Sequence, residues 1–145
     1  ILALQPRGVA TGLRIHKKLE KATKKKIDLG YLDATFFRDD FRRQAGPLRA
    51  NATKVPFLIE GKRVILVDDV LYTGRTVRAA MDAMMAFGRP KDVELLVVID
   101  RKYSRDIPIQ PNYVGREVMC QESEKVVVDI KEIEDKKELI WLVKK

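Results

Sequence analysis

The sequence predicts an α/β fold with a mostly parallel central sheet. Two stretches, residues 62–69 and 93–100, contain consecutive apolar residues (64–67 and 95–99), as expected of strands that are covered by helices on both faces. Between them, residues 75–88 have the periodicity of an amphipathic helix. A strand, a helix and a second strand in this order are typical of a parallel sheet flanked by helices.

The first part of the chain supplies two further strands and a helix to this arrangement. We expect a strand at 1–4, a break at 6–8, a helix at 9–24, a strand at 29–37 and a loop at 38–56. The helix is inferred from Ile15, Leu19 and Ala22, which share one face, and the second strand from its alternating, β-favouring residues. The predicted loop has no sustained period and is longer than most loops in compact domains, which suggests a function for it.

The second part of the chain completes the sheet and adds a β-rich tail. We expect a strand at 62–69, a helix at 75–88, a strand at 93–100 and β structure at 124–133 and 138–143. The helix ends at Gly88 and Pro90. Its predicted apolar face contains Val77, Ala80, Met81, Met84 and Met85.

Composition indicates one globular domain spanning residues 1–145. The chain is 46% hydrophobic and 34% charged, and no apolar run approaches the roughly 18 residues that a membrane span requires. A lone cysteine, Cys120, cannot form a disulfide within the chain, and no secretory signal is recognisable, so we expect a cytoplasmic protein without a membrane partner. Because the sequence opens on "ILALQP" without an initiator methionine, we expect that residues preceding Ile1 are missing from it.

Positive charge is concentrated in the first part of the chain. Residues 1–56 contain 13 Lys and Arg against 5 Asp and Glu, whereas residues 57–145 contain 16 of each, so the net charge of +8 belongs to the first part. The clusters are Lys17, Lys18, Lys21, Lys24, Lys25 and Lys26 in the predicted helix, and Arg38, Arg42, Arg43, Arg49 and Lys54 in the predicted loop. This asymmetry indicates an anionic partner on one side of the molecule, although a solvated helix face accounts equally well for the lysines.

Residues 64–76, "VILVDDVLYTGRT", place two adjacent carboxylates between a buried strand and the start of a helix. Ligands of open α/β sheets bind beyond the carboxyl ends of the strands, so Asp68 and Asp69 are expected to face such a site. Free N–H groups at the helix start, together with Gly74 and the hydroxyls of Thr73 and Thr76, suit a phosphate group. A ribose 5-phosphate would place its phosphate on this turn and its two hydroxyls on the carboxylates. The carboxylates would also stabilise positive charge developing on the sugar.

Two other interpretations of this motif stay open. Receiver domains also end a strand in adjacent aspartates, which bind Mg²⁺, and Asp100 would then be the phosphoacceptor. A plain helix N-terminus with a threonine cap accounts for one Thr and one Asp. A nucleotide-triphosphate P-loop is excluded, because no G-x-x-x-x-G-K-[ST] is present. His16 is expected at the surface and Cys120 as a small packing residue.

The same motif resembles the phosphoribosyl pyrophosphate (PRPP) motif of type I phosphoribosyltransferases. The longer stretch "DDVLYTGRTVRAAMDA" is most similar to the family of pyrimidine operon attenuators and uracil phosphoribosyltransferases, and the similarity continues through residues 31–43, 87–90, 99–113 and 123–128. This resemblance implies a parallel sheet flanked by helices, with a small C-terminal β-rich hood over the base. It implies synthesis of UMP and pyrophosphate from uracil and PRPP with Mg²⁺.

The resemblance also implies partners and site residues. The partners are a stem-loop of pyrimidine operon mRNA, whose binding responds to UMP and UTP, and other copies of the chain in a homodimer or homotetramer. The catalytic residues implied are Asp68, Asp69 and Arg101, with no metal ligand from the protein itself. The residues implied for PRPP and UMP are Arg7, Gly8, Arg42, Arg43, Asp68, Asp69, Val70, Leu71, Tyr72, Thr73, Gly74, Arg75, Thr76, Arg101 and Val126.

Two alternative functions are compatible with these residues. One is an RNA-binding regulator whose nucleotide site senses ligands without catalysis. The other is a type I phosphoribosyltransferase for hypoxanthine, guanine, adenine or orotate, since no single residue selects uracil. Tyr72 could also be a core packing residue rather than a ligand contact.

Overall fold

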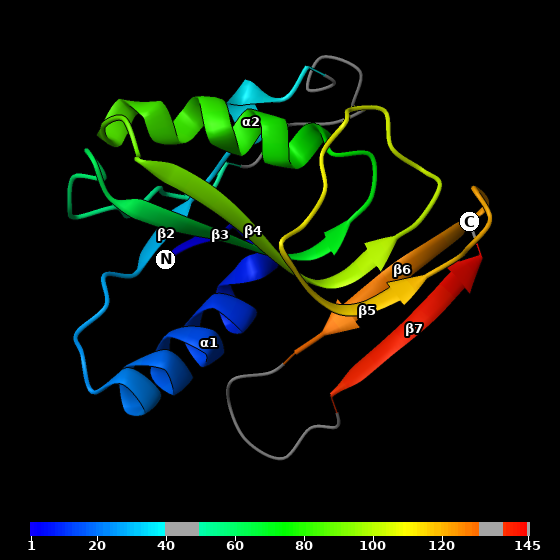
Figure 1. The fold of residues 1–145 in the computed structure, drawn as a ribbon. Coiled ribbons are helices and arrows are strands. Elements are labelled where there is room, and N and C mark those ends of the chain that lie inside the picture. Colours follow the sequence, from blue (N-terminus) through cyan, green and yellow to red (C-terminus); the bar gives the residue numbers. More distant parts are fainter. Residues whose placement is uncertain (40–49, 131–137, 145) are drawn as a thin grey trace.

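The computed structural model describes residues 1–39, 50–130 and 138–144 (Figure 1). Its strands are β1 (Leu2–Leu4), β2 (Gly30–Leu32), β3 (Arg63–Leu71), β4 (Asp92–Arg101), β5 (Tyr113–Val118), β6 (Glu124–Asp129) and β7 (Leu139–Lys144). Its helices are α1 (Gly8–Thr23) and α2 (Arg75–Met84), with short 3₁₀ turns η1 (Thr35–Phe37) and η3 (Met85–Phe87).

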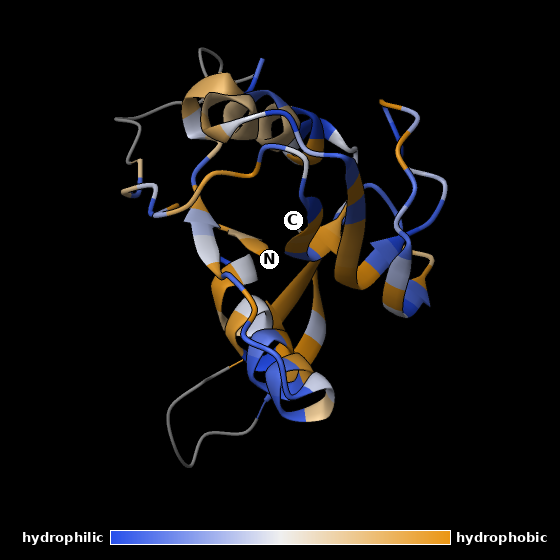
Figure 2. Cartoon of the chain, turned by 60° about the vertical axis from the view of Figure 1, so that its left-hand side comes forward, coloured by the Kyte–Doolittle hydropathy of each residue, from blue (hydrophilic) through white to orange (hydrophobic). Residues whose placement is uncertain are grey.

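The described strands form a central parallel sheet in the order β2-β1-β3-β4-β5, and β6 and β7 form a separate antiparallel pair. Figure 1 shows α1 on one face of the sheet and α2 on the other. In Figure 2 the central strands between the two helices are largely orange, as expected for strands whose two faces are covered. The predicted α/β architecture with a small C-terminal β element is therefore confirmed.

The helices occupy the predicted positions but bury somewhat different faces. Near the start of α1, Gly8, Thr11 and Gly12 are buried against the sheet, whereas Ala22, predicted on the apolar face, is exposed. In α2 the residues buried are Val77, Ala79, Ala80, Ala83 and Met84. The prediction that Met81 and Met85 belong to this buried face was wrong, since they are 40% and 52% exposed. The small alanines of α2 let the helix pack closely on the side that carries them.

The second strand is shorter than its sequence predicts. It ends at Leu32 rather than 37, because the Asp33 carboxylate accepts hydrogen bonds from the backbone N–H of Thr35 (2.7 Å) and of Asn51 (2.6 Å). These bonds turn the chain into η1 and lower the pKa of Asp33, although burial acts in the opposite direction. Residues 40–49 of the predicted loop, including Arg42, Arg43 and Arg49, lie outside the described residues.

The central strand pair is longer than predicted, and one sheet strand was missed. β3 continues to Leu71 rather than ending at 69, because β4 extends beside it and pairs Val70 with Ile99 and Leu71 with Asp100. β5 was not predicted, since its "YVGREV" sequence is polar and contains glycine. An added Cβ at Gly115 would lie 2.6 Å from the Val98 carbonyl oxygen, so the glycine permits the close approach of this edge strand.

Two further expectations from the sequence concern membrane spans and the position of His16. Among the described residues, none of the helices is both long and apolar enough to cross a bilayer. His16 is half-buried rather than on the surface: its Nε2 lies 2.7 Å from the Ile27 carbonyl oxygen and 3.4 Å from Glu20 Oε1, so it joins α1 to the segment leading into β2.

The contact between the start of α1 and β3 gives a stability prediction. An added Cβ at Gly8 would lie 2.3 Å from the Val67 carbonyl oxygen and 3.2 Å from the Asp68 Cα. We expect Gly8→Ala to lower the free energy of unfolding by about 1–3 kcal/mol, as overpacking does, measured by urea denaturation. Gly61→Asn is the control, because Gly61 has open space around it and asparagine tolerates its φ of +66°. Equal stability of the Gly8→Ala variant and wild type would contradict this close contact.

Candidate functional site

The order of the strands places a crevice between β1 and β3. From β1 the chain passes to β2 on one side, and it then returns to β3 on the other side of β1. Such a reversal leaves a crevice at the carboxyl ends of the two strands, where ligands of open α/β sheets bind. β1 stops at Leu4, and its register with β3 pairs Ala3 with Val67. Asp68 and Asp69 therefore extend past the end of β1, next to the segment that enters α1.

A cavity of about 460 Å³ opens at this position. Its lining includes the predicted site residues Arg7, Asp68, Asp69, Val70, Tyr72, Thr76, Arg101 and Val126. It also includes Gln5, Pro6, Arg38 and Lys125, which sequence reasoning did not assign to the site. The structure thus brings together the segment after β1, the carboxyl ends of β3 and β4, and the start of β6.

The two carboxylates are held by the backbone and are almost fully buried. Asp69 N–H donates to Asp68 Oδ1 (2.9 Å), and Val70 N–H donates to Asp69 Oδ1 (2.8 Å). Asp69 Oδ2 is buried without a hydrogen-bond partner, and Arg7 Nη1 approaches it only to 4.0 Å. Burial first, and then the charge of Asp69, raise the pKa of Asp68 well above its ordinary value. An unpartnered carboxylate oxygen is ready to accept from a ligand hydroxyl.

The β3–α2 turn (residues 72–74) leads from the carboxylates to the start of α2, where an anion can bind. Gly74 adopts φ +90°, a conformation that favours glycine, and precedes the first helical residue, Arg75. The first N–H groups of a helix have no partner within it and attract negative charge. Thr76 lines the cavity at this end, and its Oγ1 accepts from Arg38 Nη1 (3.2 Å).

Several residues that were predicted to bind phosphate do not present their side chains to the cavity. The Arg75 side chain binds Asp39 (2.5 Å) and Asp106 (2.9 Å), and its backbone N–H makes a long hydrogen bond to Thr73 Oγ1 (3.4 Å). Leu71 is 2% exposed and belongs to the core. Neither these residues nor Gly8, Thr73 and Gly74 are among the cavity lining. Arg42 and Arg43 lie outside the described residues.

Arg101 and Tyr72 form the wall of the cavity nearest β6. The Arg101 guanidinium lies 4.0 Å from the centre of the Tyr72 ring, and Tyr72 is therefore more than a core packing residue. Arg101 is 3% exposed and donates to the carbonyl oxygens of Glu124 (3.1 Å) and Gln121 (3.2 Å). These bonds fasten the start of β6 beside the carboxylates, which positions Lys125 and Val126 over the cavity.

The residues that sequence reasoning missed are distant from the motif along the chain. Arg38 was recognised only as one of several loop arginines, although a basic residue after a strand was a usable signal. Lys125 and Gln5 carried no comparable signal, because they are brought to the site by the β6–β7 pair and by the turn after β1.

Asp100 does not join the carboxylate pair. Although only 1% exposed, it binds Arg105 and lies 3.2 Å from Lys102 Nζ. In the parts of the chain that the structure describes, His, Cys, Asp and Glu nowhere form a group of three able to hold a metal. The three-acid arrangement that a receiver domain requires is therefore absent from those parts.

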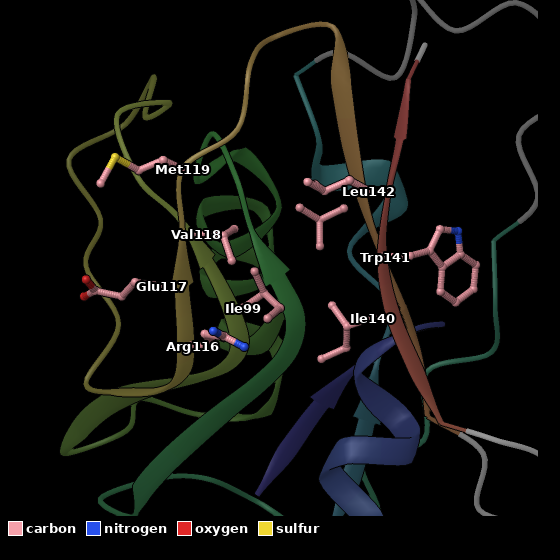
Figure 3. A pocket seen from close by; sticks show the side chains of 9 residues that line it. Ile99, Arg116, Glu117, Val118, Met119, Ile140, Trp141 and Leu142 are labelled. Atoms are coloured by element: carbon pink, nitrogen blue, oxygen red, sulfur yellow. The ribbon is translucent and has the colours of Figure 1, made fainter.

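A second pocket, of about 550 Å³, lies between β5 and β7 and differs in character. Figure 3 shows Ile140 and Leu142 of β7 directed toward Ile99 and Val118, whereas Trp141 points away. Arg116 and Glu117 are its charged lining residues. With a lining that is otherwise apolar, this pocket offers no set of donors for a sugar phosphate, so the cavity at Asp68 and Asp69 is the candidate site.

Comparison with known proteins gives concordant results. A family model described as phosphoribosyl transferase domain matches residues 1–134. "Bifunctional protein PyrR" of Caldicellulosiruptor bescii is 43% identical over 97% of this chain and 76% of its own length. The protein of the same description from Acetivibrio thermocellus is 45% identical over 92% of this chain and 72% of its own.

Solved structures show the same fold. The hypoxanthine phosphoribosyltransferase of Trypanosoma cruzi superposes with a TM-score of 0.61 at 15% identity, covering 81% of this chain and 60% of that one. A hypoxanthine-guanine phosphoribosyltransferase from Bacillus anthracis gives a TM-score of 0.58 at 18% identity, over 81% and 65%. The chain thus spans less than two thirds of these two structures. The expected type I phosphoribosyltransferase fold is confirmed.

The raised pKa of Asp68 predicts a pH dependence of stability. A folded-state pKa above the ordinary value of 3.8 means that the folded protein keeps a proton which the unfolded chain releases. This contribution to stability is complete below the ordinary pKa and is lost as the pH rises through the folded pKa. We expect the unfolding free energy of wild type to fall relative to Asp68→Asn as the pH rises from about 4 to 8, by roughly 1.4 kcal/mol per unit of raised pKa.

Urea denaturation at a series of pH values measures this difference. Asp92→Asn controls for the change in net charge, because it removes the carboxylate that pairs with Arg63 at the first residue of β4, far from the cavity. Parallel pH curves for wild type and Asp68→Asn would show that Asp68 has no raised pKa in the folded protein.

Proposed function

Because this chain belongs to the PyrR family of phosphoribosyltransferases, we propose that it transfers the phosphoribosyl group of PRPP to uracil and releases UMP and pyrophosphate. The family expected from residues 64–76 is thereby confirmed. The observation that supports this reaction best is the shared cavity of the buried carboxylates and the N-terminus of α2. One ligand that carries a diol and a phosphate satisfies both.

Substrate binding follows from the unsatisfied groups of the site. The 5-phosphate of PRPP binds the first N–H groups of α2 and the Thr76 hydroxyl. A ribose hydroxyl donates to Asp69 Oδ2, which has no other hydrogen-bond partner. The base lies under the start of β6, where Val126 is 5% exposed and Lys125 borders the cavity. Three separate elements thereby hold the phosphate, the ribose and the base, which are joined in the product UMP.

The reaction requires no protein nucleophile. As the bond from C1 of the ribose to pyrophosphate lengthens, positive charge develops on the sugar, and the adjacent Asp68 and Asp69 stabilise it. Arg7, Arg38 and Lys125 surround the same cavity and stabilise the negative charge of the departing pyrophosphate. Uracil forms a bond to C1 through its ring nitrogen N1 as the bond to pyrophosphate breaks, and the N1 proton is lost to the departing pyrophosphate or to solvent. Catalysis rests on positioning and electrostatics rather than on a covalent intermediate.

Magnesium fits this site as a companion of PRPP rather than as a resident ion. The described residues contain no three-ligand group, so Mg²⁺ would be held by oxygens of PRPP and by water, with no direct ligand from the protein. When bound, Mg²⁺ supplies charge neutralisation for the pyrophosphate.

Uracil is the proposed base, and other bases are its alternatives. Family membership favours uracil, whereas the solved neighbours of this fold include enzymes described as hypoxanthine and hypoxanthine-guanine phosphoribosyltransferases. Assays with uracil, hypoxanthine, guanine, adenine and orotate, each with PRPP and Mg²⁺, distinguish these substrates. Turnover with a base other than uracil would contradict the proposed specificity.

The catalytic role of the carboxylates gives the main test. We expect Asp69→Asn to fold and to bind UMP, but to lower kcat by about 10²–10³-fold, the usual cost of removing one preorganised electrostatic contact. The isosteric amide keeps the shape of the side chain and loses its charge. Steady-state kinetics with uracil and PRPP measure kcat, and circular dichroism checks folding. A folded Asp69→Asn variant with wild-type turnover would exclude the carboxylate from the mechanism.

A second role in RNA binding is supported by the surface of α1. Its relatives are described as bifunctional. Lys18, Lys21 and Lys25 are all exposed near the end of α1, which is mostly blue where it comes forward in Figure 2. This surface suits the phosphates of a structured RNA such as an operon leader stem-loop. Arg7, which directly precedes the same helix, lines the cavity, so the proposed RNA surface and the cavity lie toward opposite ends of α1.

We expect the triple variant Lys18→Gln, Lys21→Gln, Lys25→Gln to bind the leader RNA more weakly while keeping its kcat. The plot of log affinity against log salt has a negative slope, and the loss of each lysine–phosphate contact makes this slope shallower by about 0.7–0.9. Filter binding at several salt concentrations, with and without UMP or UTP, measures this slope. An unchanged slope would place RNA elsewhere on the protein. RNA binding by a wild-type protein without turnover would instead favour a purely regulatory function.

Two remaining features concern the oligomeric state and the cellular compartment of the protein. The described residues 139–143 of β7 are all apolar and 40–53% exposed, which is consistent with self-association into a homodimer or homotetramer. A free Cys120, in a chain with a single cysteine, is consistent with the cytoplasm.

A further inference from the structure

Arg105 connects three segments behind the β3–α2 turn. Its Nη1 donates to the carbonyl oxygens of Tyr72 (2.6 Å) and Arg101 (2.9 Å), and its Nη2 binds the Asp100 carboxylate. Its Nε donates to the Ile109 carbonyl oxygen (3.0 Å). All three guanidinium nitrogens are thus engaged, and the side chain is only 21% exposed. One residue thereby joins the turn, the end of β4 and the β4–β5 loop (residues 102–112).

The same loop binds the next carbonyl of the turn. Asp106 N–H and Ile107 N–H both donate to the Thr73 carbonyl oxygen, at 3.0 and 3.1 Å. The Asp106 carboxylate accepts from Arg75 Nε, and Ile107 lies 3.4 Å from the position of a Cβ on Gly74. The β4–β5 loop therefore supports the turn along its whole length.

These contacts all lie on the side of the turn away from the cavity. Tyr72 and Thr76 line the cavity, whereas neither Arg105 nor residues 106–109 do. The carbonyl oxygens of Tyr72 and Thr73 are acceptors that would repel a phosphate dianion. Arg105 binds the Tyr72 carbonyl oxygen, and the N–H groups of Asp106 and Ile107 bind that of Thr73, on the side away from the cavity. The backbone N–H donors at the start of α2 are therefore left to face the ligand.

We propose that Arg105 is a positioning residue for the phosphate of the substrate, acting through the carbonyl oxygen of Tyr72. It also fixes the Tyr72 ring against Arg101, since it binds the backbone of both residues. This inference rests on the proposed function, because it assumes that a sugar phosphate occupies the cavity. Arg105 itself does not touch the substrate.

Kinetics separate this role from a purely structural one. We expect Arg105→Gln to raise the KM for PRPP and the Kd for UMP by about tenfold, the effect of removing one charge-assisted hydrogen bond. The KM for uracil at saturating PRPP changes less than the KM for PRPP, because the phosphate rather than the base binds the backbone of the turn. Partial unfolding alone would lower the apparent kcat and leave both KM values unchanged.

Two further variants make the test specific. Arg105→Lys keeps the positive charge but cannot reach four acceptors with a planar fork, so the KM for PRPP stays raised. If Arg105→Gln does not fold, Arg105→Lys decides the question. Arg63→Gln removes an arginine that pairs with Asp92 at the far end of the sheet and is expected to keep both KM values.

The outcomes distinguish this inference from the proposed function. Calorimetry with UMP is carried out on wild type and all variants. If wild type binds neither UMP nor PRPP, the proposed function fails. If wild type binds both and the Arg105 variants bind them equally well, or if Arg105→Lys restores wild-type KM, the positioning role alone is overturned.

Discussion

Two adjacent carboxylates buried at the end of a parallel strand are the constraint on which this site depends. Burial of like charges is unfavourable unless other groups compensate for it. Here backbone N–H groups satisfy one oxygen of each carboxylate, but Asp69 Oδ2 has no hydrogen-bond partner. That arrangement costs stability in the free protein. It becomes favourable when a ligand supplies hydroxyl donors, and it is most useful when the ligand becomes positively charged.

The early end of β1 makes this arrangement possible. If β1 continued beside β3, its backbone would cover Asp68 and Asp69. Instead the chain turns after Leu4 into α1, and Gly8 approaches the Val67 carbonyl so closely that a side chain does not fit. Arg7 reaches the carboxylates from this turn at 4.0 Å. The architecture of the sheet thus places an arginine, two adjacent carboxyl groups and a helix N-terminus around one cavity.

The sequence predicted the parts of this structure that depend on local pattern. Runs of apolar residues identified β3 and β4, and the "DDVLYTGRT" motif identified the carboxylates and the start of α2. Features that depend on distant neighbours were missed. β5 is polar and gains its place by pairing with β4, and η1 forms because the Asp33 carboxylate binds Thr35 and Asn51. Lys125 reaches the cavity only through the tertiary fold, so no local pattern marks it, whereas Arg38 was noted only as one of several loop arginines. The buried faces of the helices were predicted only in part, because α1 packs through Gly8, Thr11 and Gly12 near its start, and in α2 the small Ala79 and Ala83 are buried while Met81 and Met85 are exposed.

A crystal structure of the protein with UMP tests the central claim most directly. We predict the phosphate at the N–H groups of Arg75 and Thr76, a ribose hydroxyl on Asp69 Oδ2, and the base beside Val126. A nucleotide bound at another position, with the N-terminus of α2 left without a phosphate, would contradict this prediction.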